Sequence, residues 1–362
     1  MKTVSILMST HNGGAHITAQ LDSIRRQDLQ PAELWVSDDG SSDETLRVVT
    51  RFAERAPFPV RICVNGEGSD PRANLLNAAL LCEGDVVAFC GQGDEWHPSK
   101  LSRCLGAFHA PDVMLVAHSA TILDEQSRYA GYLSQGIQAS QTFPALTLPP
   151  WGTFLTGSMV FRRDLLALPP ARETADGREQ GSSPPRPDRW LYTLAHGLGS
   201  VVTLAQPLMA TRQPPSTQAG LLQQIFRRGA GLSAGSAARR LRHLEATARQ
   251  RASAMAALAQ VRPPRVKARA ARAAAAYWQR MATVCALRAA VYDAPTFSRR
   301  KAAFDQLVAL RSDPAAGEAP PRGWLMRDAL SGLLQLPALV PPPVEPVHGD
   351  AGQEPETWAW PR

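Results

Sequence analysis

Residues 4–14, VSILMSTHNGG, decide the fold. The run from Val4 to Met8 is apolar, which predicts a short buried strand. A polar, glycine-containing loop ends the run, and apolar residues then recur at helical spacing from Ile17 to Ile24. The stretch therefore predicts a strand, a loop and a helix, which together are the first half of a βαβ unit.

The same alternation of strand and helix signals continues over the first 120 residues. Further strands are predicted at residues 34–36, 60–64, 86–90 and 114–117, with helical patterns between them. This order predicts an α/β fold with a mainly parallel sheet flanked by helices. Ligands of such sheets bind beyond the carboxyl ends of the strands. The polar loops at residues 9–14, 37–42 and 91–96 are therefore expected to converge on one crevice.

The composition of the 362-residue chain is that of a globular protein, with 44% hydrophobic and 20% charged residues. No apolar stretch approaches the roughly 18 residues that a membrane-spanning helix needs, and the N-terminus turns polar too soon for a signal peptide. Five cysteines form no CxxC pair, which favours reduced thiols over a disulfide framework. These features predict a cytoplasmic protein.

The net charge of +7 is unevenly distributed. Residues 221–311 hold 18 basic and 3 acidic residues, a net charge of +15, whereas the remainder holds 21 basic and 29 acidic residues. This segment reads as a basic α-helical module, which suits an anionic membrane surface; a solvated helical surface is the alternative. We do not expect nucleic acid as a partner, because the basic residues are not interleaved with aromatic ones.

Three regions follow from these patterns. Residues 1–220 are predicted to form the α/β domain, residues 221–311 the basic helical module, and residues 312–362 a proline-rich, largely disordered tail. Within the first region, residues 169–187 are rich in Pro, Gly and Ser and are predicted to form a mobile loop.

Common cofactor motifs are absent from the sequence. No G-x-G-x-x-G follows the first strand, and there is no P-loop, HExxH or GxSxG motif. What remains is acidic: Asp38 and Asp39 end the second strand. A carboxylate there can accept a hydrogen bond from a nucleobase N–H or a ribose hydroxyl. Because the following residues are good turn formers, a turn or helix-cap role is the alternative.

Several segments occur in an order and spacing that resemble a known family. The segments are Val4–Gly13, Val36–Asp43, Glu83–Asp85 through Trp96–Leu101, Gly157–Arg163 and Asp188–Leu191. They are similar to family 2 glycosyltransferases, which are inverting enzymes of the GT-A fold that use nucleotide sugars. The resemblance covers about residues 3–220 and is greatest to the branch of rhamnosyltransferase-like, O-antigen and capsule glycosyltransferases.

The resemblance implies a donor site. Asp39 would bind a uracil or thymine base, His11 would stack on that base, and Asp38 would lie near the ribose. The full set implied to bind the nucleotide sugar is Thr10, His11, Asp38, Asp39, Arg72, Gly91, Gly93, Asp94 and Arg212.

It also implies an acceptor site. Asp188 would be the general base that deprotonates the acceptor hydroxyl, and Trp96 and Trp190 would shape the acceptor pocket. For Asp188, capping of the helix that begins near Trp190 is the alternative.

One motif departs from the family pattern. The family usually ends its fourth strand in Asp-x-Asp-Asp-x-Trp, whereas this chain has Gly91-Gln92-Gly93-Asp94-Glu95-Trp96. The missing carboxylates normally hold Mg²⁺ or Mn²⁺ against the donor diphosphate. Two family histidines near that ion are also replaced, by Pro187 and Pro214.

Three states are compatible with these losses. In the first, Arg212, Lys100 or Arg72 supplies the positive charge and the enzyme needs no metal. In the second, Asp94 and Glu95 hold a metal weakly. In the third, the chain is a catalytically impaired partner or binding protein.

The resemblance thus implies an inverting glycosyltransferase with a UDP- or dTDP-linked donor and a saccharide or lipid-linked acceptor. It would act in cell-surface polysaccharide synthesis, as a peripheral protein at the inner face of the cytoplasmic membrane.

Overall fold

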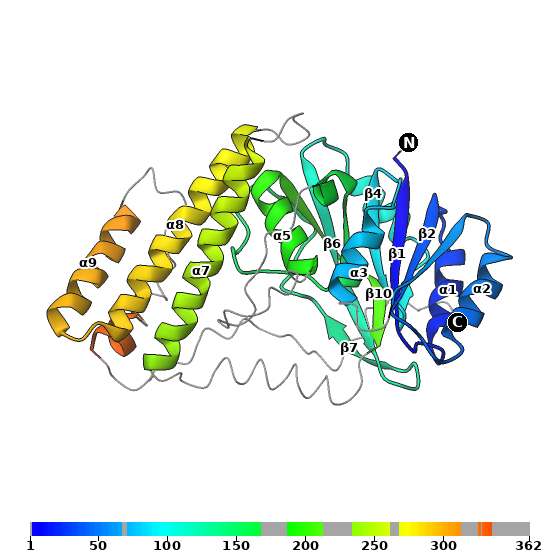
Figure 1. Ribbon diagram of the computed structural model, residues 1–362, viewed down its shortest axis with the longest axis horizontal. Coiled ribbons are helices and arrows are strands. Elements are labelled where there is room, and N and C mark those ends of the chain that lie inside the picture. The colour runs from blue at the N-terminus through cyan, green and yellow to red at the C-terminus, as the bar shows by residue number, and fades with distance from the viewer. Residues whose placement is uncertain are drawn as a thin grey trace. The chain divides into compact units, whose positions relative to one another are not determined.

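The computed structural model describes residues 2–66, 71–167, 187–212, 234–260, 268–312, 325–326 and 328–334 (Figure 1). The chain divides into two compact units. The described part of the first unit is residues 2–66, 71–167 and 187–212, and that of the second begins at residue 234. The predicted boundaries at residues 220 and 311–312 fall at or within segments whose placement is not described.

The first unit begins with the predicted alternation of strands and helices. Its elements are β1 (Val4–Thr10), α1 (Ile17–Arg25), β2 (Glu33–Asp38), α2 (Thr45–Ala53), β3 (Val60–Val64), α3 (Pro71–Ala79) and β4 (Val86–Gly91). There follow β5 (Asp94–Trp96), α4 (Lys100–Ala107), β6 (Val113–Leu123), β7 (Tyr129–Leu133) and β8 (Gln141–Phe143). The unit continues with the short helix η1 (Thr156–Ser158), β9 (Met159–Arg162), η2 (Arg163–Ala167), α5 (Pro187–Leu198) and β10 (Ser200–Arg212).

The strands form one sheet in the order β3-β2-β1-β4-β9-β6-β10-β5, with β7 paired to β6 and β8 to β10. The first four strands are parallel throughout. Beyond them the sheet is mixed, because β9 runs antiparallel to both β4 and β6. The predicted fold class, α/β with a flanked sheet, is confirmed, and the parallel half carries the predicted loops.

Helix placement follows from the order of the strands. The path from β1 to β3 runs one way across the sheet, and the path from β3 to β4 runs back. Right-handed crossovers therefore place α1 and α2 on one face and α3 on the other. In Figure 1, α3 and α5 lie on the same side of the sheet.

Apolar strands explain why this half of the sheet is the core. Every residue of β1 except Ser9 is buried, and β4 is buried from Val86 to Cys90. Strands covered on both faces read as continuous apolar runs rather than as alternating ones. One hydrophobic cluster joins β1, β2 and β4 to α1 and α4.

The second unit is helical, as predicted. It contains α7 (Ala234–Leu258), α8 (Ala268–Asp293), α9 (Phe297–Ser312) and the single-turn π-helix η4 (Asp328–Leu333). Arg251 lies over the ring of the buried Trp278, at 4.6 Å from its centroid. The acidic residues Glu245, Asp293 and Asp305 are each paired with a basic side chain. None of the described helices is both long and apolar enough to cross a membrane.

Candidate functional site

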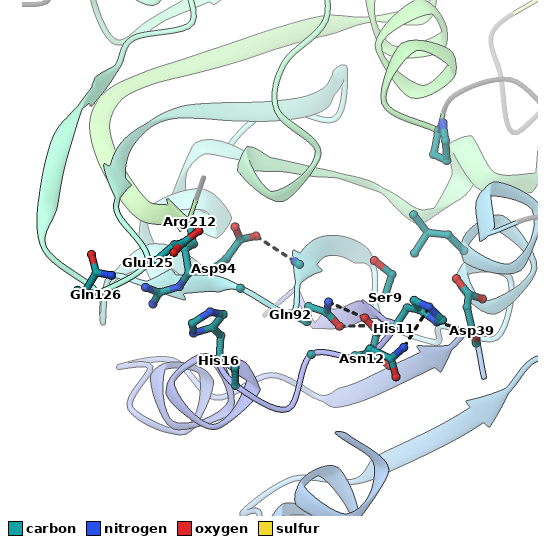
Figure 2. A pocket seen from close by; sticks show the side chains of 17 residues that line it. Ser9, His11, Asn12, His16, Asp39, Gln92, Asp94, Glu125, Gln126 and Arg212 are labelled. Carbon is teal, nitrogen blue, oxygen red and sulfur yellow. Dashed lines mark hydrogen bonds between the residues drawn. The ribbon is translucent and has the colours of Figure 1, made fainter. Parts of the chain in front are cut away.

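A pocket of about 990 Å³ lies where the parallel strands end (Figure 2). It is lined from the ends and following loops of β1, β2 and β4, from α3, from the turn between β6 and β7, from the start of α5 and from the end of β10. The lining residues are Ser9, Thr10, His11, Asn12, Gly13, Ala15, His16, Asp39, Leu75, Gly91, Gln92, Gly93, Asp94, Glu125, Gln126, Pro187 and Arg212. The predicted convergence of the three loops is thus observed.

At one end of the pocket stands the Asp39 carboxylate, close to His11 (Figure 2). Its Oδ1 accepts hydrogen bonds from the side-chain amides of Asn65, at 2.9 Å, and Asn74, at 2.6 Å. The His11 ring is held against the same residue, with Nδ1 at 3.0 Å from the Asp39 carbonyl oxygen. A carboxylate and an aromatic ring are therefore presented together at this end.

Asp38 has a different position from its neighbour. Its side chain is fully buried and does not line the pocket. Its Oδ2 accepts hydrogen bonds from the hydroxyls of Thr10 and Ser41, both at 2.6 Å, and its Oδ1 accepts one from the Ser41 backbone N–H. The predicted contact of Asp38 with a ribose is not supported, because this carboxylate joins the loops after β1 and β2. Thr10 lines the pocket, but its hydroxyl is committed to Asp38.

Gln92 joins the loop after β4 to the loop after β1. Its side-chain Oε1 accepts from the His11 backbone N–H at 2.8 Å, and its Nε2 donates to the His11 carbonyl at 2.9 Å. The fit is close at Gly13, where a Cβ atom would stand only 2.3 Å from Gln92 Oε1. The two loops are thus fixed to each other at the centre of the pocket.

Asp94 supports the loop that replaces Asp-x-Asp. Its Oδ2 accepts the Gly91 backbone N–H at 3.0 Å, and its carboxylate also bonds the Thr211 side chain. Burial raises the pKa of Asp94 above its usual value, against the influence of these bonds and of Lys100. The Asp94 carboxylate is therefore already hydrogen-bonded to Gly91 and Thr211.

Charged side chains gather at the other end of the pocket, where Figure 2 shows Arg212, Glu125 and His16. Arg212 donates to Glu95 Oε1 at 2.9 Å and to the Asp124 carbonyl at 2.9 Å. Burial, and then the positive charge of Arg212, lower the pKa of His16. Arg212 and His16 are thus the basic side chains that line this end of the pocket.

The residues present do not fit a divalent cation. Gly91 and Gly93 supply no side-chain oxygen, Asp94 is hydrogen-bonded to its own loop, and Glu95 is paired with Arg212. Within the described residues, no group of three or more His, Cys, Asp or Glu side chains is arranged to hold an ion. A weak metal site at Asp94 is therefore not supported.

A buried lysine interacts with the pocket-lining Asp94. Lys100 is fully buried, donates to the Gly157 carbonyl at 2.6 Å and stands 3.7 Å from the centroid of the Trp96 ring. Burial lowers the pKa of Lys100 to about 8. Trp96 is only 2% exposed and belongs to the core, so its predicted place in an acceptor pocket is not supported.

Asp188 and Trp190 lie in the first turn of α5, next to the pocket-lining Pro187. Both side chains are 3% exposed. Thr153 Oγ1 donates to Asp188 Oδ2 at 3.4 Å. Trp190 is buried rather than presented to an acceptor, and Asp188 is placed at the edge of the pocket without lining it. The backbone of Arg72 lies in α3, and its side chain is outside the described part of the structure.

Sequence reasoning missed several residues of the site. Among them are Asn12, His16, Asn65, Asn74, Gln92, Glu125 and Gln126. For Asn12 and Gln92 the signal was their place in loops that follow strands. The two asparagines that bond Asp39 carried no local signal, because they are 26 and 35 residues away from it.

Comparison with known proteins gives a family match over part of the chain. Residues 5–167 match the model described as glycosyl transferase family 2. An uncharacterised glycosyltransferase of Nostoc sp. is 29% identical over 168 residues, which are 45% of this chain and 52% of that protein. An Escherichia coli UDP-Glc:α-D-GlcNAc-diphosphoundecaprenol β-1,3-glucosyltransferase is 27% identical over 104 residues, 28% of this chain and 40% of that protein. The matched part of the chain thus spans about half or less of these relatives.

Solved structures were also compared. Staphylococcus aureus TarS in complex with UDP aligns with a TM-score of 0.49 and 15% identity, covering 92% of this chain and 83% of that one. A Pyrobaculum calidifontis mannosyltransferase in complex with GDP-Man and Mn²⁺ aligns with a TM-score of 0.42 and 17% identity, covering 92% and 88%. The family match supports a glycosyl transferase family 2 domain at residues 5–167.

Proposed function

We propose that this chain is an inverting glycosyltransferase whose nucleotide-sugar donor binds in the pocket at the ends of β1, β2 and β4. The observation that carries the proposal is the convergence of Asp39, His11 and the Gly91–Gly93 loop in one pocket. The family match over residues 5–167 supports the same function. Asp39 would accept an N–H of the base, and the two glycines let the backbone approach the diphosphate.

The proposed transfer needs no divalent cation. A departing nucleoside diphosphate carries negative charge that must be offset in the transition state. Arg212 is cationic and His16 is a second basic side chain at the end of the pocket opposite Asp39. The His16 ring would take up a proton as the diphosphate binds. We assign the offset to these two side chains, because they are the basic side chains that line this end of the pocket among the described residues.

Asp188 is the proposed general base. Inverting transfer is a displacement in which a carboxylate opposite the leaving group takes the proton of the attacking hydroxyl. Asp188 lies in the first turn of α5, directly after the pocket-lining Pro187. Its burial would keep water from competing with the acceptor once the acceptor is bound.

The donor would be UDP- or dTDP-linked and the acceptor a saccharide or a lipid-linked saccharide, as in rhamnosyl or hexosyl transfer during O-antigen or capsule synthesis.

The second unit would hold the enzyme at the anionic inner face of the cytoplasmic membrane. Exposed arginines support this: Arg239, Arg240, Arg269 and Arg272 have no ion pair within the described residues. Each such residue contributes about 1 kcal/mol near an anionic surface. Flotation with anionic vesicles should therefore weaken as salt is raised, and salt-independent flotation would contradict this part.

The proposed function is tested by nucleotide release. The full chain is incubated in EDTA with UDP-linked hexoses or dTDP-rhamnose and with lipid-linked saccharide acceptors, and the released nucleoside diphosphate is measured. We expect acceptor-dependent release that falls at least about a hundredfold in Asp188→Asn, the order of a general base's contribution. Asp164→Asn, at an exposed aspartate of η2, is the matched control and should be unchanged. Binding without release would instead favour the catalytically impaired alternative, which the replacement of Asp-x-Asp motivates.

A further inference from the structure

Among the described residues, hydrogen bonds to the Asp39 carboxylate reach one of its two oxygens. Its Oδ1 accepts two amide hydrogen bonds, from Asn65 and Asn74. No hydrogen bond to its Oδ2 is found in the described part of the chain. An ionised carboxylate has two acceptor oxygens, so one whole oxygen remains for a ligand in the pocket.

The orientation of this carboxylate is fixed by three elements. Asn65 follows β3, where its backbone N–H bonds the Asp38 carbonyl at 2.8 Å. Asn74 comes from α3 and is only 8% exposed. The Asp39 backbone N–H bonds the carbonyl of Thr10, at the end of β1, at 2.9 Å. Rotation of the carboxylate to offer both oxygens would break the two amide bonds.

The nucleobases differ in what they offer to such a group. Uracil and thymine present a single imide N–H. Guanine presents two N–H groups side by side, a fork that pairs with both oxygens of a carboxylate much as arginine does. Cytosine and adenine carry an exocyclic amine that can donate at the corresponding edge, but the ring nitrogen beside it is an acceptor, which an ionised carboxylate repels.

We propose that Asn65 and Asn74 select the base of the donor. By holding Oδ1 of Asp39 they leave one acceptor oxygen, which suits the imide N–H of uracil or thymine and leaves one N–H of guanine without a partner. A site built for one hydrogen-bonding pattern discriminates against a ligand that leaves polar groups unpaired. The inference rests on the proposed function, since it takes Asp39 to face the base, and the two asparagines act as positioning residues.

The test is calorimetric titration of the full chain with UDP, dTDP, GDP and CDP in EDTA. We expect UDP and dTDP to bind at least about tenfold more tightly than GDP or CDP, a difference of about 1.4 kcal/mol. Asn65→Ala and Asn74→Ala each remove one of the two hydrogen bonds to Oδ1 and so free an acceptor position on it. The ratio of the GDP to the UDP dissociation constant should therefore fall at least about fivefold in each. Asn77→Ala is the matched control, because Asn77 is an exposed residue on the same helix, and its ratio should not change.

The ratio separates selection from a merely structural role, which would weaken all nucleotides alike. If an alanine variant fails to fold, the serine variant is used instead, and the comparison of nucleotides on the unaltered chain needs no variant. GDP binding as tightly as UDP, or an unchanged ratio in both asparagine variants, would overturn the inference while leaving the proposed function intact. Absence of binding by every nucleotide would overturn both.

Discussion

The side-chain amide of Gln92 pairs with the backbone of His11 on both sides, accepting from its N–H at 2.8 Å and donating to its carbonyl at 2.9 Å. The parallel pairing of β1 with β4 ends at Ser9 and Gly91. Beyond this point the side chain of Gln92, rather than its backbone, makes the hydrogen bonds that connect the two segments. The His11 ring is proposed to stack on the base, and the Gly91–Gly93 loop is proposed to bind the diphosphate. Gln92 therefore links these two parts of the donor site.

Replacing Gln92 should loosen the donor site. Gln92→Ala removes two hydrogen bonds, each worth roughly 1 kcal/mol, and we expect the UDP dissociation constant to rise about five- to thirtyfold. Gln92→Glu can no longer donate to the His11 carbonyl and should weaken binding as well. Calorimetry measures both, with Gln138→Ala as the control, because Gln138 is an exposed glutamine that does not line the pocket. Unchanged UDP affinity in both Gln92 variants would show that these two hydrogen bonds do not position His11 for donor binding.

A carboxylate restored at residue 93 should make UDP binding depend on metal. A Cβ at Gly93 would come no closer than 3.7 Å to the Arg212 Cβ, so a side chain can begin there without a clash. Two like charges 4 Å apart repel by about 4 kcal/mol at an effective dielectric of about 20. Gly93→Asp should therefore weaken UDP binding in EDTA at least tenfold, and Mn²⁺ should recover part of the loss. Gly93→Ala controls for the lost glycine, and an aspartate variant that binds normally in EDTA would place the diphosphate elsewhere.

Donor binding should take up a proton at His16. Burial and the charge of Arg212 lower the pKa of His16 below its usual 6.5, so the ring is neutral in the free protein at pH 7 and above. A diphosphate beside it favours the protonated ring. By linkage, UDP affinity should rise as pH falls from about 8 towards 6.5. Calorimetry across this range in His16→Gln should lose the dependence, and His109→Gln, at an exposed histidine, should keep it. Equal slopes in all three proteins would refute the assignment.

The buried Lys100 should make stability rise at alkaline pH. Its pKa is about 8 in the folded chain against 10.5 ordinarily, so the unfolded chain binds more protons between these values. The contribution of Lys100 to the free energy of unfolding therefore increases from pH 8 to 10.5. Urea unfolding should show Lys100→Met gaining most over the natural chain below pH 8 and progressively less above it. Lys301→Met, at an exposed lysine, should show no such trend; a constant difference for Lys100→Met would contradict the shifted pKa.

The sequence predicted those strands whose burial on both faces requires a run of apolar residues. Strands β1 and β4 are covered on both faces and therefore read as apolar runs. The short strands β7 and β8 are largely exposed and left no such run, so they were not predicted.

The location of the site could be predicted from the sequence better than the roles of its individual residues. The ends of the strands located the pocket, but Asp38 and Asp39 are adjacent residues of the same type. Only the structure shows that Asp38 is buried and bonded to Thr10, whereas Asp39 lines the pocket. Trp96 and Trp190 illustrate the same limit, since a tryptophan beside a site fits either core or ligand contact. The partners of Asp39 come from β3 and α3, and contacts between distant segments leave no local pattern.

The central claim is that this pocket binds a nucleotide donor without a divalent cation. The most direct measurement is calorimetric titration of the full chain with UDP, once with Mn²⁺ and once with EDTA, beside an Asp39→Ala variant. The account predicts the same dissociation constant in both conditions and a loss of at least about tenfold in the variant. Binding only with Mn²⁺, or no binding in either condition, would contradict it.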